Sequence, residues 1–552
     1  MHSDRRAVHA ARTKTYDLNG VSKLNERLER LQDPVKDRAT SHVQRAIVAF
    51  LLVLGGLAFA LHFLHLRADF PNHSPWVDWA KYTDEGWYGD AAIRHYLRGT
   101  WRLPGDFNPA VALPVWPLVE AGLFRFTGVG IVAARALTVC VFGCILCSSF
   151  FFLRLRAERR GDRPMRTVFA AAAVLVLAAS PFVYVFTRLA ILEPLLVLMM
   201  LLSLQAAYAM RLARLRWQRA AYAAGVGLLI ALMIGTKTTA VFLLPAIAYM
   251  LADSAECRGR RMLRTGLITG GVVALLCGSY FLMLVHRGYL GDFRYLFSAN
   301  AYTGITRSTF FKTVGETLTD GMWTGPLTYP LAGLMLVIAC LRPRVWRDPV
   351  FTSLALWAAG YMIFMAYHAN MQPRYYLVVA VPLVLLLLRG ALHVAEWNPV
   401  APLALVPLLL LVVGHEARQT VNFARHPDYT YQTAAVRIEH IIEAEPSHSH
   451  TVLSISGSNL SLMTGLPSIC DDFGTMQLED RIAAYQPGWF VAWNYVEDDK
   501  MQALSRFYTL TRVGEFPAMD DPDRNLMIVY RLDPKEGVKP RRKRPGAKLL
   551  PM

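Results

Sequence analysis

The chain has 552 residues, of which 54% are hydrophobic, and its mean hydropathy is +0.30. Soluble domains are usually about 45 to 50% apolar, so the composition excludes an ordinary soluble protein and indicates a membrane protein. The formal net charge of +17 is high enough for nucleic-acid binding, but the basic residues fall in short groups between apolar segments. We therefore expect no nucleic-acid partner, because this spacing is typical of membrane topology.

About eleven segments are predicted to cross the membrane, because each approaches the roughly 20 apolar residues that a spanning helix needs. The first, at 44–66, follows a strongly polar segment and is followed by no small-residue cleavage site, so we expect an uncleaved anchor. The other predicted spans are 130–153, 167–187, 189–209, 219–236, 238–252, 265–286, 326–341, 350–367, 374–389 and 400–415.

Arginine-rich loops predict the orientation of these spans. If the N-terminus is cytoplasmic, every short basic loop falls on the cytoplasmic side, as the positive-inside rule requires. The same alternation places loop 67–129, loop 287–325 and the region after about residue 416 on the opposite side. We therefore predict a multi-pass protein of the inner (plasma) membrane, with a cytoplasmic N-terminus and an extracytoplasmic C-terminal domain.

Four parts follow from this topology. They are a polar cytoplasmic segment (1–43), a transmembrane domain (44–415), an extracytoplasmic α/β domain (416–535) and a basic, disordered tail (536–552). Within loop 67–129, the amphipathic stretch Asp84–Leu97 and the apolar stretch Ala110–Phe126 are predicted as helices at the membrane interface.

The predicted α/β domain is inferred from alternating hydrophobic patterns. A helical stretch at Thr433–Glu445 precedes strand-like segments at Thr451–Ile455, Trp489–Trp493 and Asn525–Leu532. This region contains a single cysteine, Cys470, so it must be held together by packing rather than by an internal disulfide.

Acidic residues stand just beyond the first span, in the sequence Y-T-D-E-G-W-Y. Asp84 or Glu85 could serve as a general base toward a hydroxyl group, with the other binding or orienting the substrate, and Asp90 follows closely. The alternative is a structural helix start, in which Asp84 caps the helix and Glu85 complements its dipole.

Cationic residues recur at the predicted outer ends of later spans. Arg188 and Glu193 lie in one outer hairpin, Lys237 lies in G-T-K-T-T, and Arg374 and Tyr375 lie in P-R-Y-Y. Arginine and lysine at these places suit a phosphate group, whereas the alternatives are a structural ion pair at the hairpin and a snorkelling lysine. Because topology places these cations on the same side as the acidic pair, they predict a site for a phosphate leaving group and a base.

Taken in order, these motifs resemble the GT-C superfamily of membrane glycosyltransferases, in the branch of protein O-mannosyltransferases and lipid A aminoarabinose transferases. The resemblance rests on D-E-G-W-Y followed by G-T-W-R-L-P and a proline-rich run, then on T-R-L-A-I-L-E-P, G-T-K-T-T and P-R-Y-Y. It covers residues 44 to about 390 and implies an all-α GT-C-like membrane domain. It also implies inverting transfer of a sugar from a polyprenyl-phosphate donor to a lipid, glycan or protein acceptor.

The resemblance also implies roles for single residues. Asp84 would be the catalytic base and Glu85 its partner in positioning the substrate. Glu193 and Asp90 would contact these site residues rather than the substrate. The residues implied to hold the donor phosphate are Arg188, Lys237, Arg374 and Tyr375. Some similar enzymes use a divalent metal near the acidic loop and others do not, so the sequence leaves the metal unknown.

Two other functions compete with this interpretation. A transporter of lipid-linked saccharide would place charged residues near the bilayer midplane, whereas here they lie at helix ends. A ligase or polymerase of lipid-linked oligosaccharides would be a transferase with a different donor. The sequence does not identify the sugar.

Overall fold

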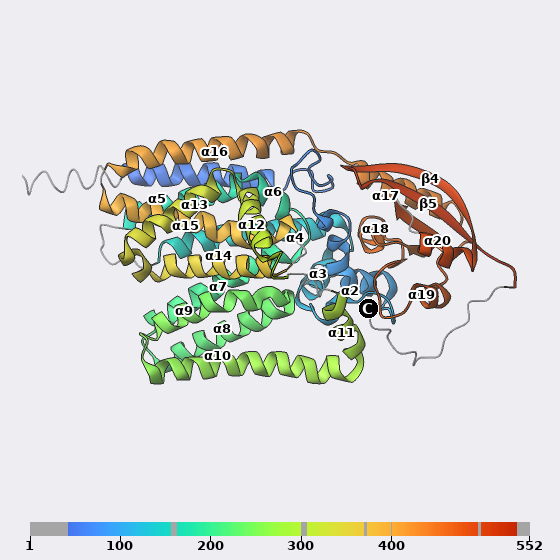
Figure 1. Ribbon diagram of the computed structural model, residues 1–552, viewed down its shortest axis with the longest axis horizontal. Coiled ribbons are helices and arrows are strands. Elements are labelled where there is room, and N and C mark those ends of the chain that lie inside the picture. Colours follow the sequence, from blue (N-terminus) through green and yellow to red (C-terminus); the bar gives the residue numbers. More distant parts are fainter. Residues whose placement is uncertain are drawn as a thin grey trace, which may run out of the picture.

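The computed structural model describes residues 42–155, 163–299, 306–368, 372–398, 400–494 and 498–537. The described residues form an elongated bundle of helices, and a β-sheet with its own helices lies beyond one end of it (Figure 1). We call that end the site end. The predicted fold class, an all-α membrane domain with a small C-terminal α/β region, is confirmed. Most of the predicted polar segment 1–43 and basic tail 536–552 lies outside the described residues.

The bundle is built from helices that match the predicted spans. In the described part of the chain, eight helices are long and apolar enough to cross a membrane, and a pair bent by 116° makes up to nine. With two shorter apolar helices, Met165–Ala179 and Thr238–Ser254, they occupy all the predicted positions. The principal helices are His42–Leu61, α4 (Ile131–Leu153), α5 (Arg163–Ala179), α7 (Leu192–Leu212), α8 (Arg216–Thr236), α9 (Leu244–Ser254), α10 (Gly259–Tyr280), α13 (Thr328–Leu341), α14 (Pro349–Tyr367), α15 (Leu377–Trp397) and α16 (Ala401–Arg425).

The centre of the bundle is α15. In the apolar part of this span, 89% of the residues are buried, whereas in the first helix the share is 6%. The first helix therefore lies at the periphery of the bundle. A near-continuous run of Val and Leu lets α15 bury its whole circumference, as a helix in the middle of a bundle must. Short elements connect the spans: α6 (Pro181–Phe186), η4 (Thr238–Leu243), η5 (Phe281–Tyr289), α11 (Leu290–Ala299), α12 (Phe310–Asp320), η6 (Gly321–Thr324), η7 (Pro343–Arg347) and η8 (Pro373–Tyr376).

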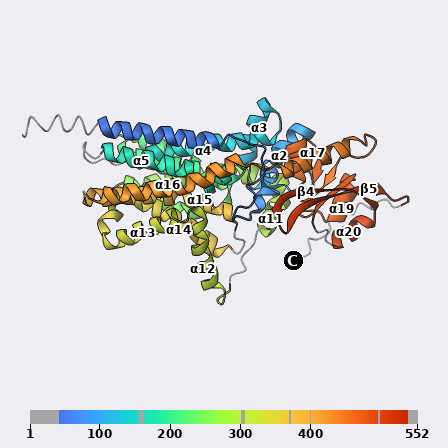
Figure 2. The same cartoon turned by 90° about the horizontal axis from the view of Figure 1, so that it is seen from above.

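Two helices of the predicted outer loop lie between the bundle and the sheet (Figures 1 and 2). They are α2 (Asp84–Arg98) and α3 (Val115–Thr127), preceded by the short turns η1 (Trp79–Lys81) and η2 (Pro109–Val111). Acidic residues in the first turn of α2 complement the helix dipole, and Gly99, with a φ of 70°, ends it in the left-handed conformation. Both predicted helices of this loop are therefore confirmed.

The C-terminal region is a five-stranded sheet in the order β2-β1-β3-β5-β4. β1 pairs in parallel with β2 and β3, while β5 pairs antiparallel with β3 and β4. The strands are β1 (Val452–Leu453), β2 (Ser468–Ile469), β3 (Trp489–Trp493), β4 (Tyr508–Asp521) and β5 (Arg524–Pro534). The helices are α17 (Thr430–Glu443), α18 (Gly457–Thr464), α19 (Leu478–Tyr485) and α20 (Asp498–Ser505).

The three predicted strands and the predicted helix are present, although β1 is shorter than expected because α18 starts soon after it. Two strands were not predicted: β2 has only two residues, and β4 is an edge strand whose middle residues are mostly exposed. Such a strand lacks the buried alternation that marks a strand in sequence. Cys470 is buried and forms no disulfide, and the region is held together by packing, as expected, because apolar side chains of the sheet, α17 and α18 form one cluster.

Candidate functional site

Charged side chains from five separate segments meet at the site end of the bundle. Each is less than one tenth exposed, although charged groups are rarely buried unless they are paired. We call them the charged cluster: Asp78, Asp84, Glu193, Lys237 and Arg374. Burying three carboxylates and two cations together is costly, which makes this cluster the strongest candidate for a functional site among the described residues.

Arg374 is the centre of the cluster. Its Nη1 lies 2.6 Å from Oδ1 of Asp78, and its Nη2 lies 2.8 Å from Oδ2 of Asp84. Its Nε lies 3.8 Å from Oε1 of Glu193. The backbone N–H of Arg374 also donates to Asp78 Oδ2 at 2.8 Å, since Pro373 starts the turn η8 and directs this group toward η1. One guanidinium therefore holds three carboxylates from distant parts of the chain.

Asp84 is the first residue of α2 and points into this cluster. Its Oδ1 accepts a hydrogen bond from Thr83 Oγ1 at 3.0 Å. Burial is the main cause that raises the pKa of Asp84 above its usual value; Arg374 opposes the shift, and Asp78 and Glu193 add to it. A carboxylate with a raised pKa is a better proton acceptor than one on the surface, which suits a general base.

Lys237 is the cation of the cluster that comes from α8. It follows the last helical residue, and its Nζ pairs with Oε1 of Glu193, which lies in the first turn of α7. Nζ also lies 4.1 Å from the centroid of the Tyr375 ring, and the guanidinium of Arg374 lies 4.9 Å from the same ring. Tyr375 is therefore an aromatic wall shared by both cations.

Glu85 lies outside the charged cluster, although it is next to Asp84 in sequence. Its two oxygens accept hydrogen bonds from Nε and Nη2 of Arg135 at 2.7 and 2.6 Å, and Oε1 also accepts from the backbone N–H of Ala190 at 2.9 Å. This bidentate pair ties α2 to α4 and to the turn before α7. The carboxylate is fully buried and already engaged by these donors.

Arg188 and Asp90 also belong to other networks. Arg188 donates to the backbone carbonyl groups of His62, Leu64 and His65, at 3.1, 2.5 and 2.8 Å, and so binds the end of the first helix. Asp90 pairs with Arg94 at 2.8 Å. Of the residues singled out from sequence, the structure therefore brings together Asp84, Glu193, Lys237, Arg374 and Tyr375 and places Glu85, Arg188 and Asp90 elsewhere.

Sequence reasoning missed Asp78. Its Oδ1 accepts from the backbone N–H of Ala80 at 2.8 Å and caps η1, while both oxygens also receive Arg374. Only its position, six residues before Asp84, could have indicated Asp78 as a site residue, because a single aspartate in a loop forms no distinctive sequence pattern.

The C-terminal region contacts the helix that begins with Asp84. Asn459 Oδ1 accepts from the backbone N–H of Gly86 at 2.5 Å, and Ser458 Oγ donates to Asp90 Oδ1 at 2.9 Å. A Cβ atom at Gly86 would overlap the backbone of Ser458 and Asn459, so only glycine permits this approach. α18 therefore packs directly against α2, which the sequence did not indicate.

No group of three or more His, Cys, Asp and Glu side chains in the described part of the chain is arranged to hold a metal ion. The carboxylates of the acidic loop, where a divalent metal was considered, are each paired with a different arginine. Asp84 pairs with Arg374, Glu85 with Arg135 and Asp90 with Arg94.

The apolar helices and the C-terminal sheet define the fold of a multi-pass membrane protein. Two solved structures of ArnT from Cupriavidus metallidurans share this fold. The one bound to undecaprenyl phosphate matches with a TM-score of 0.58 at 14% identity, over 87% of this chain and 98% of that chain. The apo structure matches with a TM-score of 0.57 at 14% identity, over 88% and 98%.

The Archaeoglobus fulgidus oligosaccharyltransferase, in complex with Zn and sulfate, has a TM-score of 0.49 at 11% identity over 87% of this chain and 72% of that chain. Neither a protein-family model nor a curated protein matches the chain by sequence. The resemblance to the GT-C superfamily that the motifs indicated is thus confirmed at the level of the fold.

Proposed function

We propose that this protein is an inverting glycosyltransferase that moves a sugar from a polyprenyl-phosphate carrier to an envelope acceptor, which is a lipid, a glycan or a protein. The observation that carries the proposal is the buried Asp84, held by Arg374 beside Lys237, at one end of a membrane bundle. The shared fold with ArnT, which binds undecaprenyl phosphate in one of its structures, supports the choice of donor.

In this reaction a hydroxyl oxygen of the acceptor attacks the anomeric carbon of the sugar, and the bond between that carbon and the phosphate oxygen breaks. Asp84 takes the proton of the hydroxyl group, for which its raised pKa suits it. The electron pair of the broken bond leaves with the carrier phosphate. Cations fixed in a dry site stabilise such a leaving group strongly.

Lys237 is the cation that we assign to the phosphate. In the structure it is paired with Glu193, so donor binding would exchange the Lys237–Glu193 pair for a Lys237–phosphate pair, while the Tyr375 ring stays in contact with the ammonium group. Arg374 is already shared among Asp78, Asp84 and Glu193, so we assign it chiefly to orienting Asp84. Glu85 acts indirectly, by fixing α2 through Arg135.

We further propose that the site end faces the non-cytoplasmic side of the inner membrane and that the N-terminus is cytoplasmic. The arginine-rich loops between spans support this orientation. Reporter fusions after Arg347 and within 416–535 should lie on opposite sides of the membrane. Fusions on the same side would contradict the orientation.

The function is tested with the purified full chain reconstituted in vesicles with a polyprenyl-phosphate sugar and an extract of envelope lipids and glycans. We expect release of polyprenyl phosphate that depends on the extract and is lost in Asp84→Asn. The exposed substitution Asp523→Asn is the control and should leave release unchanged. Movement of the intact donor across the membrane without cleavage would contradict the proposal and indicate a transporter.

A further inference from the structure

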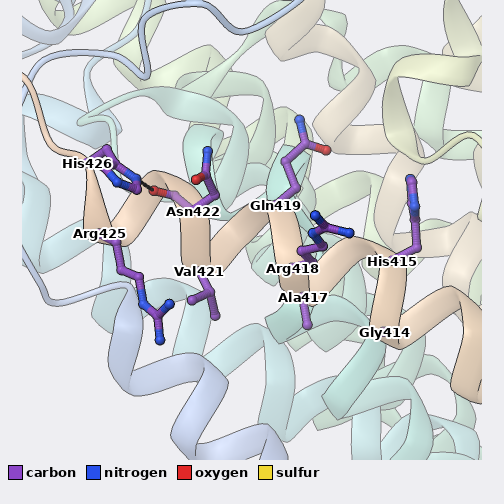
Figure 3. Close-up of a pocket in the computed structure, with 9 residues that line it drawn as sticks. All are labelled: Gly414, His415, Ala417, Arg418, Gln419, Val421, Asn422, Arg425 and His426. Carbon is purple, nitrogen blue, oxygen red and sulfur yellow. Dashed lines mark hydrogen bonds between the residues drawn. The ribbon is translucent and has the colours of Figure 1, made fainter.

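α16 has two different faces in its second half. One face is buried against the bundle and contains Val412, Glu416, Thr420 and Ala424, all at most 7% exposed. The other face is exposed and lines an open hollow of about 800 Å³ (Figure 3). Its exposed polar lining residues, which we call the α16 basic row, are His415, Arg418, Asn422, Arg425 and His426, and the half-buried Gln419 also lines the hollow.

The exposed face is apolar in the first half of the same helix. Leu403, Leu410 and Leu411 are 76%, 63% and 57% exposed, as expected for side chains that face lipid. Leu411, Arg418 and Arg425 are spaced by seven residues, so they lie on nearly one stripe, because a heptad departs from two helical turns by only about 20°. A single exposed stripe thus changes from leucine to arginine along the helix axis.

Contacts on the buried face show where this change occurs relative to the bundle. Thr420 Oγ1 donates to the carbonyl group of Ala179, the last residue of α5, at 2.6 Å. Thr328, the first residue of α13, donates to Glu416 at 2.6 Å. The basic row therefore begins at the level where neighbouring spans end at the site end, and we place the headgroups of one leaflet at this level.

In the part of the chain that the structure describes, the two arginines of this row have no acidic partner. Among the described residues, no carboxylate lies within ion-pair distance of Arg418 or Arg425, and His426 Nδ1 faces the carbonyl group of Asn422 in its own helix at 3.0 Å. Gly414 also lines the hollow, and no atom lies within 4 Å of the position that a Cβ atom would take there. The hollow is thus open, positively charged and continuous with a lipid-facing surface.

We propose that the α16 basic row binds the phosphate headgroup of an anionic phospholipid in the leaflet at the site end. The phosphate would lie between Arg418 and Arg425, whose planar groups suit bidentate contacts with phosphate oxygens. One acyl chain would lie along Leu411, Leu410 and Leu403. A phospholipid fits this stripe because its charged headgroup and apolar chain follow one another in the same order as the arginines and leucines along the helix. The site is independent of the sugar transfer proposed above.

Native mass spectrometry of the full chain in a neutral detergent, titrated with phosphatidylglycerol or with zwitterionic phosphatidylcholine, tests the site. A basic residue near an anionic lipid surface contributes about a fivefold gain in binding. The double substitution Arg418→Gln/Arg425→Gln should therefore weaken phosphatidylglycerol binding about thirtyfold and weaken phosphatidylcholine binding much less, because the choline cation of that lipid offsets the charge of its phosphate. Because both side chains are exposed, the melting temperature should not change.

The matched control is Arg287→Gln/Arg294→Gln, which removes the same charge from exposed positions on η5 and α11. Retained phosphatidylglycerol binding in this control supports a local site. Equal losses in both double variants would show a general charge effect and overturn the proposal. It would also be overturned if millimolar inorganic phosphate displaced the lipid completely, since the hollow would then be a simple anion site.

Discussion

Asp84 and Glu85 are consecutive residues of α2, both buried and both paired with an arginine, yet their surroundings differ. Glu85 receives three hydrogen bonds, from Arg135 and Ala190, whereas Asp84 shares Arg374 with Asp78 and Glu193. Burial raises the pKa of Asp84; Arg374 opposes this shift, and the like charges of Asp78 and Glu193 add to it. Two neighbouring carboxylates on one helix therefore differ in function because Glu85 is fully engaged by its own donors, whereas Asp84 shares one guanidinium with two other carboxylates.

The matched amides Asp84→Asn and Glu85→Gln test this comparison most directly. We expect Asp84→Asn to lower turnover about a thousandfold, because a general base contributes about 10² to 10⁴ in rate, with little effect on thermal stability. Glu85→Gln should lower the free energy of unfolding by about 3 kcal/mol, because it leaves Arg135 buried with an incomplete partner. The folded fraction should still turn over. If both variants lost turnover to a similar extent per folded molecule, the distinction between Asp84 as the base and Glu85 as a structural residue would be wrong.

The two cations Lys237 and Arg188 give the next largest contrast. Lys237→Gln should lower turnover about a hundredfold, because one fixed donor to a leaving group is worth about 10² to 10³ in rate. Arg188→Gln should chiefly lower the melting temperature, since its donors bind backbone carbonyl groups at the end of the first helix. Turnover and melting curves of both proteins measure the difference. A larger loss of turnover in Arg188→Gln than in Lys237→Gln would instead indicate that Arg188 binds the phosphate.

Asn459 tests whether the C-terminal region positions Asp84. Asn459→Ala leaves the Gly86 N–H buried without its acceptor, which costs about 1 to 3 kcal/mol. We expect kcat to fall about tenfold, while KM for the donor stays within about twofold, because the start of α2 loosens. Asn494→Ala is the control, as its side chain accepts from Asn525 and Leu526 away from α2. An equal fall in the control would show a general loss of the domain fold instead.

The pH dependence of kcat/KM should show the smallest effect. The base must be ionised to act, and the pKa of Asp84 is raised, so activity should fall on acidification at a higher pH than for an ordinary aspartate at about 3.9. Asp78→Asn removes a neighbouring negative charge and should move this acidic limb to lower pH. A shift to higher pH would contradict the assignment of Asp84 as the titrating group.

The sequence determined much of the fold. Apolar runs gave the spans because a helix in lipid must satisfy its own backbone, and each run is visible without knowing its neighbours. The alternating segments Trp489–Trp493 and Asn525–Leu532 likewise gave two of the strands. β4 stayed hidden because its exposed edge position leaves no apolar pattern.

For the site, topology grouped Asp84, Glu193, Lys237 and Arg374 at one end of the bundle. Only the tertiary structure decided which neighbour each side chain faces. Consecutive residues on a helix point about 100° apart, so the rotation of α2 against its neighbours assigns Asp84 to Arg374 and Glu85 to Arg135. That rotation is held by contacts from distant segments, such as Asn459 on Gly86, and no local pattern in the chain encodes a contact across 373 positions.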